Sequence, residues 1–158
     1  MSPRAACRLE ALGFTDVYDY VAGKADWLAH NLPTEGERAN APTAGMKLRH
    51  DVPIAGPDET VAAVRARVDA SRYRFALVVA ADRTLLGRLR HTVLGGDPEA
   101  AAHEVMELGP STTRPDSPLT SIRSHLRDHD MTYIIVTDPE GRLLGTVHAT
   151  DLEGSSPE

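Results

Sequence analysis

The second half of the chain combines amphipathic segments with short apolar runs. Between residues 115 and 128, apolar side chains recur at helical spacing, namely Leu119, Ile122 and Leu126. The segment 133–136 is a run suited to a buried strand, and the turn-forming segment 138–141 separates it from a further apolar strand over 143–148. The pattern predicts a turn, a helix, a strand, a hairpin turn and a second strand, in that order.

The same pattern occurs once before in the chain, at a constant offset of 58 residues. The pairs at this offset are Pro57 and Pro115, Asp58 and Asp116, Val61 and Leu119, Val64 and Ile122, Phe75 and Tyr133, and the segments 85–87 and 143–145. An offset without gaps over roughly thirty residues indicates two copies of one unit. Because one three-stranded unit cannot bury both faces of its sheet, we expect the copies to pack together as one α/β (α+β) domain.

The boundaries follow from composition. Repeat 1 is expected over about 48–95 and repeat 2 over about 97–153, so that the pair spans 48–153 and leaves a tail over 154–158. Between the repeats, Asp97 and Pro98 predict the start of a helix that runs to about Leu108.

The region before the repeats has a different pattern. Residues 1–36 predict a helix that begins at Ser2 and Pro3 and ends at Gly13, a strand over 17–21, and a second helix over 24–29. Residues 37–47 are rich in Pro, Gly and polar residues, which is typical of a linker.

Composition excludes several classes of partner. The chain has 158 residues, is 41% hydrophobic and carries a formal net charge of −6, with no long Lys or Arg run, so nucleic acid and anionic membranes are not expected partners. No apolar stretch reaches the roughly 20 residues of a membrane span, and the first residues lack the apolar core of a secretory signal. The single cysteine, Cys7, cannot form an internal disulfide. These features predict a cytoplasmic location.

Repeat 2 resembles the CBS domain, and with repeat 1 the resemblance covers residues 46–153. The matching parts are Val105 and Met106, Pro115 and Asp116, the segment 133–136, and the closing segment Gly145-Thr146-Val147-His148-Ala149-Thr150-Asp151. The resemblance implies a tandem pair that binds an adenosine-containing ligand (AMP, ADP, ATP or S-adenosylmethionine) in a cleft between the repeats. It also implies that Asp151 accepts hydrogen bonds from the ribose hydroxyls.

The resemblance implies one complete ligand site. Its residues would be Asp151, His148 and Val147 of repeat 2 with Ile54, Tyr73, Arg74 and Phe75 of repeat 1. His148 stands where the family has a hydroxyl residue, and a protonated imidazole there could contact phosphate. A second, weaker site would use Thr112, Met131, Thr132 and Tyr133 with Arg90. It has Val93 where the first site has Asp151, and therefore lacks a diol acceptor.

Residues 1–36 resemble the C-terminal third of a rhodanese-like domain. The matching residues include Pro3, Leu9, the pair Gly13-Phe14, and the segment 23–28 around Trp27. In that family the catalytic cysteine lies before the position of Ser2, and Cys7 falls inside the helix at a packing position. The resemblance therefore implies a remnant without sulfurtransferase activity, unless translation starts upstream and a complete rhodanese domain precedes the linker.

Two functions remain open at this level. The first is a non-enzymatic regulatory module that binds a nucleotide and needs no cofactor; the resemblance also implies a homodimer. The second is an interaction protein whose repeats have lost ligand binding and are retained for dimerisation. A metal site is not expected, because His125 and His129 have the spacing of two ligands on one helix face but no partner follows in the required pattern.

Overall fold

A computed structural model describes residues 3–36 and 41–152. Its helices are α1 (Pro3–Ala11), α2 (Gly23–Ala29), α3 (Val61–Asp69), α4 (His91–Leu94), α5 (Ala102–Val105) and α6 (Leu119–Asp128), with 3-10 turns η1 (Ala44–Lys47) and η2 (Ala149–Asp151). Its strands are β1 (Ile54–Ala55), β2 (Phe75–Val79), β3 (Leu85–Arg90), β4 (Glu107–Leu108), β5 (Thr112–Thr113), β6 (Tyr133–Thr137) and β7 (Leu143–His148). The expected helix start at Ser2, part of the linker (37–40), the end of repeat 2 at 153 and the tail lie outside the described residues.

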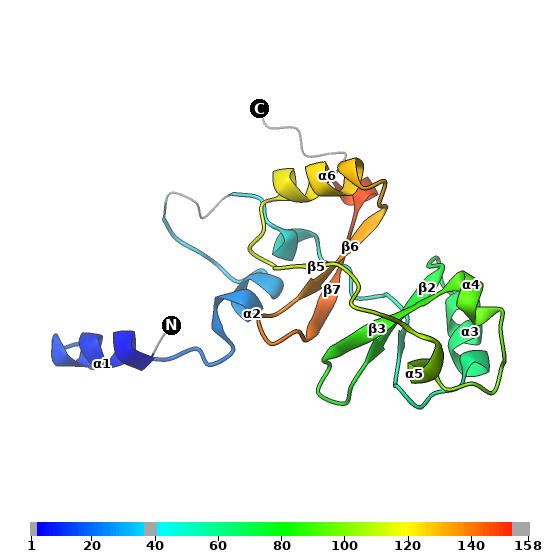
Figure 1. Ribbon diagram of the computed structural model, residues 1–158. Coiled ribbons are helices and arrows are strands. Elements are labelled where there is room, and N and C mark those ends of the chain that lie inside the picture. Colours follow the sequence, from blue (N-terminus) through cyan, green and yellow to red (C-terminus); the bar gives the residue numbers. More distant parts are fainter. Residues whose placement is uncertain (1–2, 37–40, 153–158) are drawn as a thin grey trace.

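Each repeat forms its own small sheet, as the sequence predicts. In the first sheet, the order is β1-β2-β3-β4, and in the second it is β5-β6-β7. In both, a two-residue strand pairs in parallel with the central strand, which pairs antiparallel with the next strand along the chain. Helix α3 packs beside the first sheet and α6 beside the second, and the two sheets meet at the middle of the molecule (Figure 1). The mixed α+β fold with two small sheets is therefore confirmed.

The hydrogen bonds repeat at the same offset of 58 residues as the sequence. The amide of Ala44 donates to the carbonyl of Ser117, and the amide of Ala102 donates to the carbonyl of Glu59. Both central pairings contain an irregularity at the same point, between Val78 and Val79 in one sheet and one offset later in the other. The two repeats are thus equivalent in backbone geometry as well as in sequence.

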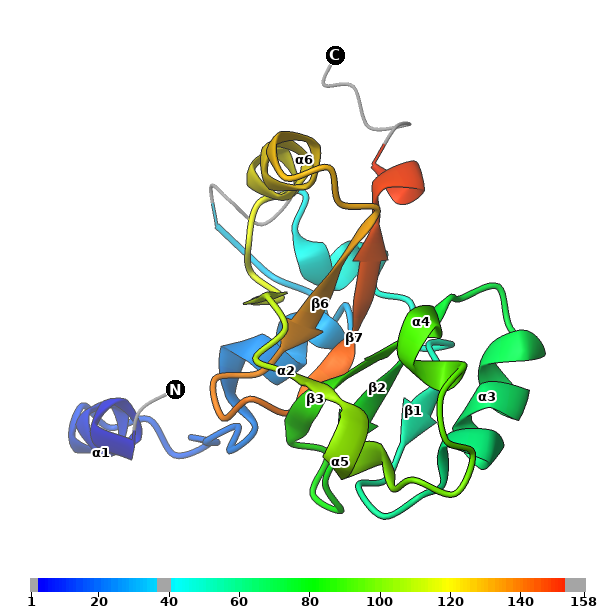
Figure 2. The same cartoon turned by 45° about the vertical axis from the view of Figure 1, so that its right-hand side comes forward.

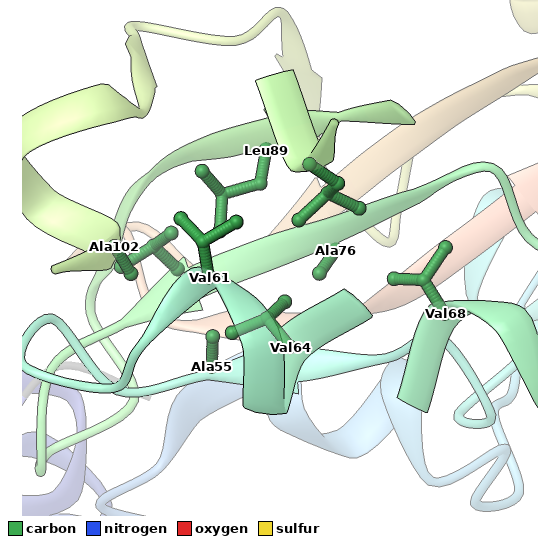
Figure 3. Close-up of a cluster of buried hydrophobic side chains, with 9 residues drawn as sticks. Ala55, Val61, Val64, Val68, Ala76, Leu89 and Ala102 are labelled. Carbon is green, nitrogen blue, oxygen red and sulfur yellow. The ribbon is translucent and has the colours of Figure 1, made fainter. Parts of the chain in front are cut away.

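The opening segment of each repeat packs on the core of the other repeat. Ala102 of α5, which precedes repeat 2, is fully buried in the core of repeat 1 together with Val61 and Leu89, and Figure 3 shows these three side chains converging. Reciprocally, Ala44 of η1 is fully buried in the core of repeat 2. Residues 43–47, which were expected to belong to a linker, therefore form part of the folded pair.

A third core joins the two repeats. It consists of side chains from both central strands and their neighbours, namely Val52, Tyr73, Phe75, Leu77, Val79, Ile135 and Leu143, and all of these are buried. Leu77 and Ile135, at equivalent positions in the two repeats, have exposed fractions of 0% and 1%. The repeats therefore bury apolar faces against each other, as expected for units too small to fold alone.

Two expected elements differ from the structure. The segment 97–108 forms only the short helix α5, followed by β4, because residues 107 and 108 pair with Gly87 and Arg88 at the edge of the first sheet instead of continuing a helix. Residues 17–21 form no strand, and Tyr18 and Val21 are exposed; alternation of strand-forming residues has no effect without a sheet edge beside it.

The N-terminal region lies at one side of the second repeat. Helix α1 points away from the remainder of the chain in both views, whereas α2 lies against the repeat pair (Figure 2). The contact of α2 is close: a Cβ at Gly45 would collide with the backbone carbonyl of Leu28. Trp27 donates to the carbonyl of Pro33 (2.8 Å) and contacts Tyr20 edge to face, so it anchors this region as predicted. None of the helices formed by the described residues has the length and apolar character to cross a membrane.

Candidate functional site

The closing segment of repeat 2 places Asp151 at the end of a strand. Strand β7 ends at His148, and the chain turns through η2, where the amide of Ala149 donates to the carbonyl of Thr132 (2.9 Å). Leu152 is buried in the core of repeat 2 and anchors the segment that follows Asp151. The carboxylate of Asp151 therefore has a well-defined position at the corner between a strand and a turn.

Arg49 occupies both oxygens of this carboxylate. Its Nε donates to Oδ2 of Asp151 (2.7 Å) and its Nη2 donates to Oδ1 (2.5 Å), and each of the two side chains is 23% exposed. The hydrogen bonds from Arg49 are the main reason why the pKa of Asp151 lies below its ordinary value. Asp151 is thus ionised and held in a bidentate, charge-assisted pair.

The backbone fixes Arg49 at this place. Its amide donates to the carbonyl of Thr146 (2.8 Å), and the amide of Thr146 donates to the carbonyl of Arg49 (3.0 Å). Thr146 itself is fully buried. Sequence reasoning missed Arg49, although its place at the same offset before Glu107, a residue that also precedes a repeat's closing motif, was visible in the sequence.

A second polar cluster lies beside the first. The hydroxyl of Tyr73 and the guanidinium of Arg72 both donate to the carboxylate of Asp51, whose pKa these contacts lower to about 2. Burial and the bond to Asp51 raise the pKa of Tyr73. Asp51 and Arg72 were also missed by sequence reasoning; they link to the candidate site through Tyr73.

His148 lies against the ring of Tyr73. The two rings meet edge to face with their centroids 5.3 Å apart, and Nε2 of His148 lies 3.3 Å from Oγ1 of Thr146. Burial is the main cause that lowers the pKa of His148, and the nearby guanidinium of Arg49 acts in the same direction. The imidazole is therefore mainly neutral at pH 7 and does not supply the positive charge expected for phosphate binding.

The other residues expected around Asp151 are divided between core and surface. Phe75 is buried and stacks on Tyr133, with centroids 4.1 Å apart and planes 10° from parallel. Val147 is fully buried in the core of repeat 2, so its side chain is not available to a ligand. Ile54 and Arg74 are exposed. The structure thus brings Tyr73, His148 and Asp151 together with Arg49, while the ring of Phe75 belongs to the core between the repeats.

The equivalent position in repeat 1 has different chemistry. Here Glu107 accepts from Nη2 of Arg88 (2.6 Å) and from Nε of Arg90 (2.9 Å). Arg88 also donates to the hydroxyl of Tyr133 (2.9 Å). Of the remaining residues expected in a second, weaker site, Met131 is half-buried and Thr112 and Thr132 are exposed. A carboxylate that is already shared by two guanidinium groups lies where the first site has Arg49.

The histidine pair on α6 has no metal-binding partners. The rings of His125 and His129 have centroids 4.5 Å apart. Among residues 3–36 and 41–152, no group of three or more His, Cys, Asp or Glu side chains could hold a metal ion. Two imidazoles alone do not complete a four-coordinate site.

A large open cavity lies elsewhere in the molecule. It has a volume of about 1240 Å³ and is lined by residues of α2, such as Asp26, and by residues of the hairpin between β6 and β7, such as Arg142. Asp151, Tyr73 and His148 do not line it. Because it also lacks a cluster of convergent polar groups like that around Asp151, we place the candidate site at Asp151 on chemical grounds rather than on volume.

Comparison with known proteins identifies the repeats. The family model described as the CBS domain matches residues 102–154. No curated protein matches the chain. The rhodanese-like resemblance of residues 1–36 receives no support from these comparisons.

Solved structures match both repeats. The cytosolic domain of the Mg²⁺ channel MgtE in complex with ATP is 26% identical, with a TM-score of 0.63 over 70% of this chain and 47% of that chain. This chain thus spans about half the length of that protein. The CBS domains of a transcriptional regulator from Streptococcus pneumoniae are 17% identical, with a TM-score of 0.67 over 73% of this chain and 100% of that chain.

A CBS domain protein from Pyrobaculum aerophilum, complexed with AMP, is 16% identical, with a TM-score of 0.61 over 72% of this chain and 92% of that chain. The two sheets, their reciprocal opening segments and their equivalent hydrogen bonds are thus accounted for by one known architecture. Residues 102–154 match the CBS domain, and the two repeats together have the fold of a CBS domain pair.

Proposed function

We propose that this chain is a regulatory module that binds an adenosine-containing nucleotide through Asp151, between its two repeats. The observation that carries the proposal is the position of the Asp151 carboxylate, ionised and fixed at the end of β7. Such a carboxylate offers two acceptors to the two hydroxyls of a ribose. The matched MgtE domain is in complex with ATP and the matched protein from P. aerophilum with AMP, which supports a ligand of this class.

The proposed output is a change of population between conformations. Asp151 belongs to repeat 2, whereas Arg49 and Tyr73 belong to repeat 1, so a ligand that contacts all three would alter the relation between the repeats. A ligand shifts such an equilibrium by its differential affinity for the two states. The proposal assigns no catalytic step to the chain, and it includes a cytoplasmic location and a homodimer as in the CBS resemblance.

The second candidate is a protein that binds no ligand and serves for assembly. It is favoured by the pairing of Asp151 with Arg49 and by the burial of Tyr73 and Phe75, because these contacts satisfy the site without a ligand. In this alternative, the two repeats would be retained for the surface that they present to a second copy or to another protein.

Thermal unfolding with AMP, ATP and S-adenosylmethionine separates the two functions. A ligand present at 100 times its dissociation constant adds about 2.7 kcal/mol to stability, which is a readily measured rise in melting temperature. We expect at least one of these ligands to produce such a rise. Asp151→Ala should abolish it, whereas the matched variant Val93→Ala, at the equivalent position of repeat 1, should preserve it. The absence of a rise with every ligand would favour the assembly function.

A further inference from the structure

The Arg49–Asp151 pair has a consequence for the choice of ligand. Both oxygens of Asp151 are engaged by the guanidinium, and a ribose diol would need the same two oxygens. Since the backbone of Arg49 is bonded in both directions to Thr146, the main chain holds Arg49 in place and the competition concerns its side chain. A ligand that takes Asp151 must therefore release the guanidinium of Arg49.

The released guanidinium would lie in a region that has no spare negative charge close by. The adjacent carboxylate of Asp51 is engaged by Arg72 and by the hydroxyl of Tyr73. Arg72, whose guanidinium carbon lies 5.7 Å from the centre of the Tyr73 ring, is itself close enough to Arg49 to repel it. His148 is mainly neutral. A guanidinium that is only 23% exposed and has lost its carboxylate is costly unless a new anion replaces that carboxylate.

We propose that Arg49 makes this site selective for phosphate-bearing adenosine ligands. The 5′-phosphate of AMP, ADP or ATP would take over the guanidinium while the ribose takes over Asp151, so both charges remain paired. Adenosine offers no such anion. S-adenosylmethionine adds a sulfonium and an ammonium group near Arg49 and Arg72, which opposes binding. This inference rests on the proposed function and narrows its ligand class from all adenosine compounds to nucleotides.

Calorimetric titration of the full chain with AMP, adenosine and S-adenosylmethionine tests the proposal. The wild-type chain should bind AMP at least tenfold more tightly than adenosine or S-adenosylmethionine. In Arg49→Ala, adenosine should bind more tightly than it binds wild type, because Asp151 is no longer occupied, and the preference for AMP should fall toward unity. Arg49→Gln, which retains much of the aliphatic stem, provides the same measurement if Arg49→Ala does not fold by circular dichroism.

Arg67→Ala is the matched control. Arg67 forms an ion pair with Glu59 on the surface of repeat 1, so its removal deletes one arginine without touching the candidate site. The ratio of AMP to adenosine affinity should be unchanged in this variant. If it falls as in Arg49→Ala, net charge rather than Arg49 sets the preference, and the proposal is wrong.

The outcomes separate this proposal from the one on which it rests. Failure of the wild-type chain and of both Arg49 variants to bind any of the three compounds would contradict the nucleotide-binding function itself. Equal binding of AMP and adenosine by the wild-type chain would leave that function intact and overturn the role of Arg49. Tighter binding of all compounds to Arg49→Ala at an unchanged ratio would show Arg49 to be a competitor only, which would also overturn the proposed selectivity.

Discussion

The two repeats use the same backbone for opposite charges. Arg49 before β1 and Glu107 in β4 are equivalent positions, and each pairs through its backbone with the third-last strand of contacts in the closing motif, at Thr146 and Arg88 respectively. In one repeat the arginine binds a carboxylate of the closing motif, and in the other the glutamate binds two arginines of the closing motif. The framework is symmetric, whereas the chemistry is inverted.

Glycines account for the shared part of this arrangement. A Cβ at Gly145 would lie 2.6 Å from the carbonyl oxygen of Arg49, and a Cβ at Gly87 would lie 2.8 Å from that of Glu107. Neither glycine has a positive φ, so it is the close approach of another backbone segment that requires glycine here. The comparison shows that the backbone contacts define the repeat, and that the side chains beside them decide what each site can bind.

The largest expected effect concerns the core that the repeats share. Leu77→Ala and Ile135→Ala, at equivalent and fully covered positions, should each lower the free energy of unfolding by about 2–5 kcal/mol, because each leaves a cavity between the repeats. Urea denaturation of the two variants provides the measurement. Leu12→Ala, at an exposed position before the repeats, should change stability by less than about 0.5 kcal/mol. A small effect at only one of the two core positions would contradict their equivalence.

The next effect concerns the two glycines. Gly145→Ala should cost about 1–3 kcal/mol, because the new methyl group meets a backbone oxygen that can move only if Arg49 moves with it. Gly87→Ala should cost less, since part of its contact is with the flexible side chain of Met106. Thermal unfolding measures both. Gly95→Ala, where the nearest atom is 3.6 Å away, serves as the control and should leave the melting temperature nearly unchanged.

A smaller effect concerns the inverted site. Arg88→Ala should cost about 1 kcal/mol, because the Arg88 side chain is only 19% exposed and also bonds the hydroxyl of Tyr133. Arg90→Ala removes an arginine from the same carboxylate, but the Arg90 side chain is 57% exposed, so less than about 0.5 kcal/mol is expected. Denaturant titration of the pair shows the order. A greater loss in Arg90→Ala would mean that charge alone, without burial, stabilises this site.

The smallest effect is a pH dependence that only one repeat has. His148 has a lowered pKa in the folded chain, so the unfolded chain binds the proton more readily, and stability should fall as the pH falls through about 6.5 toward the folded-state pKa. In repeat 1 the equivalent residue is Arg90, which does not titrate in this range. His148→Gln should flatten the pH profile of the melting temperature between pH 5 and pH 7.5, by roughly the width of one histidine titration. An unchanged slope would assign the dependence to other histidines.

The fold could be predicted from the sequence because its main signals are local and occur twice. The helix periodicity of residues 119–128 and the apolar run of 133–136 correspond to α6 and β6, and the offset of 58 residues transfers them to α3 and β2. The predicted strand over 17–21 and the long helix over 97–108 were wrong for one reason: each depends on whether a sheet edge lies nearby, which a local pattern does not contain.

The candidate site was less predictable. The family pattern pointed to Asp151 and His148, and the structure places them beside Tyr73 as expected. It could not reveal Arg49, since a residue 102 positions away reaches Asp151 only through the pairing of its backbone with Thr146. Nor could it reveal that Phe75 stacks on Tyr133, because the same aromatic residue suits a buried interface and a base-binding surface equally well.

The reciprocal opening segments make the pair a closed circuit. Since η1 completes the core of repeat 2 and α5 completes the core of repeat 1, neither repeat contains all of its own core within its own stretch of sequence. A chain cut at residue 48 would retain every strand and still lose Ala44 from the far repeat, so the effect of the truncation would be felt at the opposite end of the molecule. We therefore expect the two repeats to unfold as a single cooperative unit rather than one after the other.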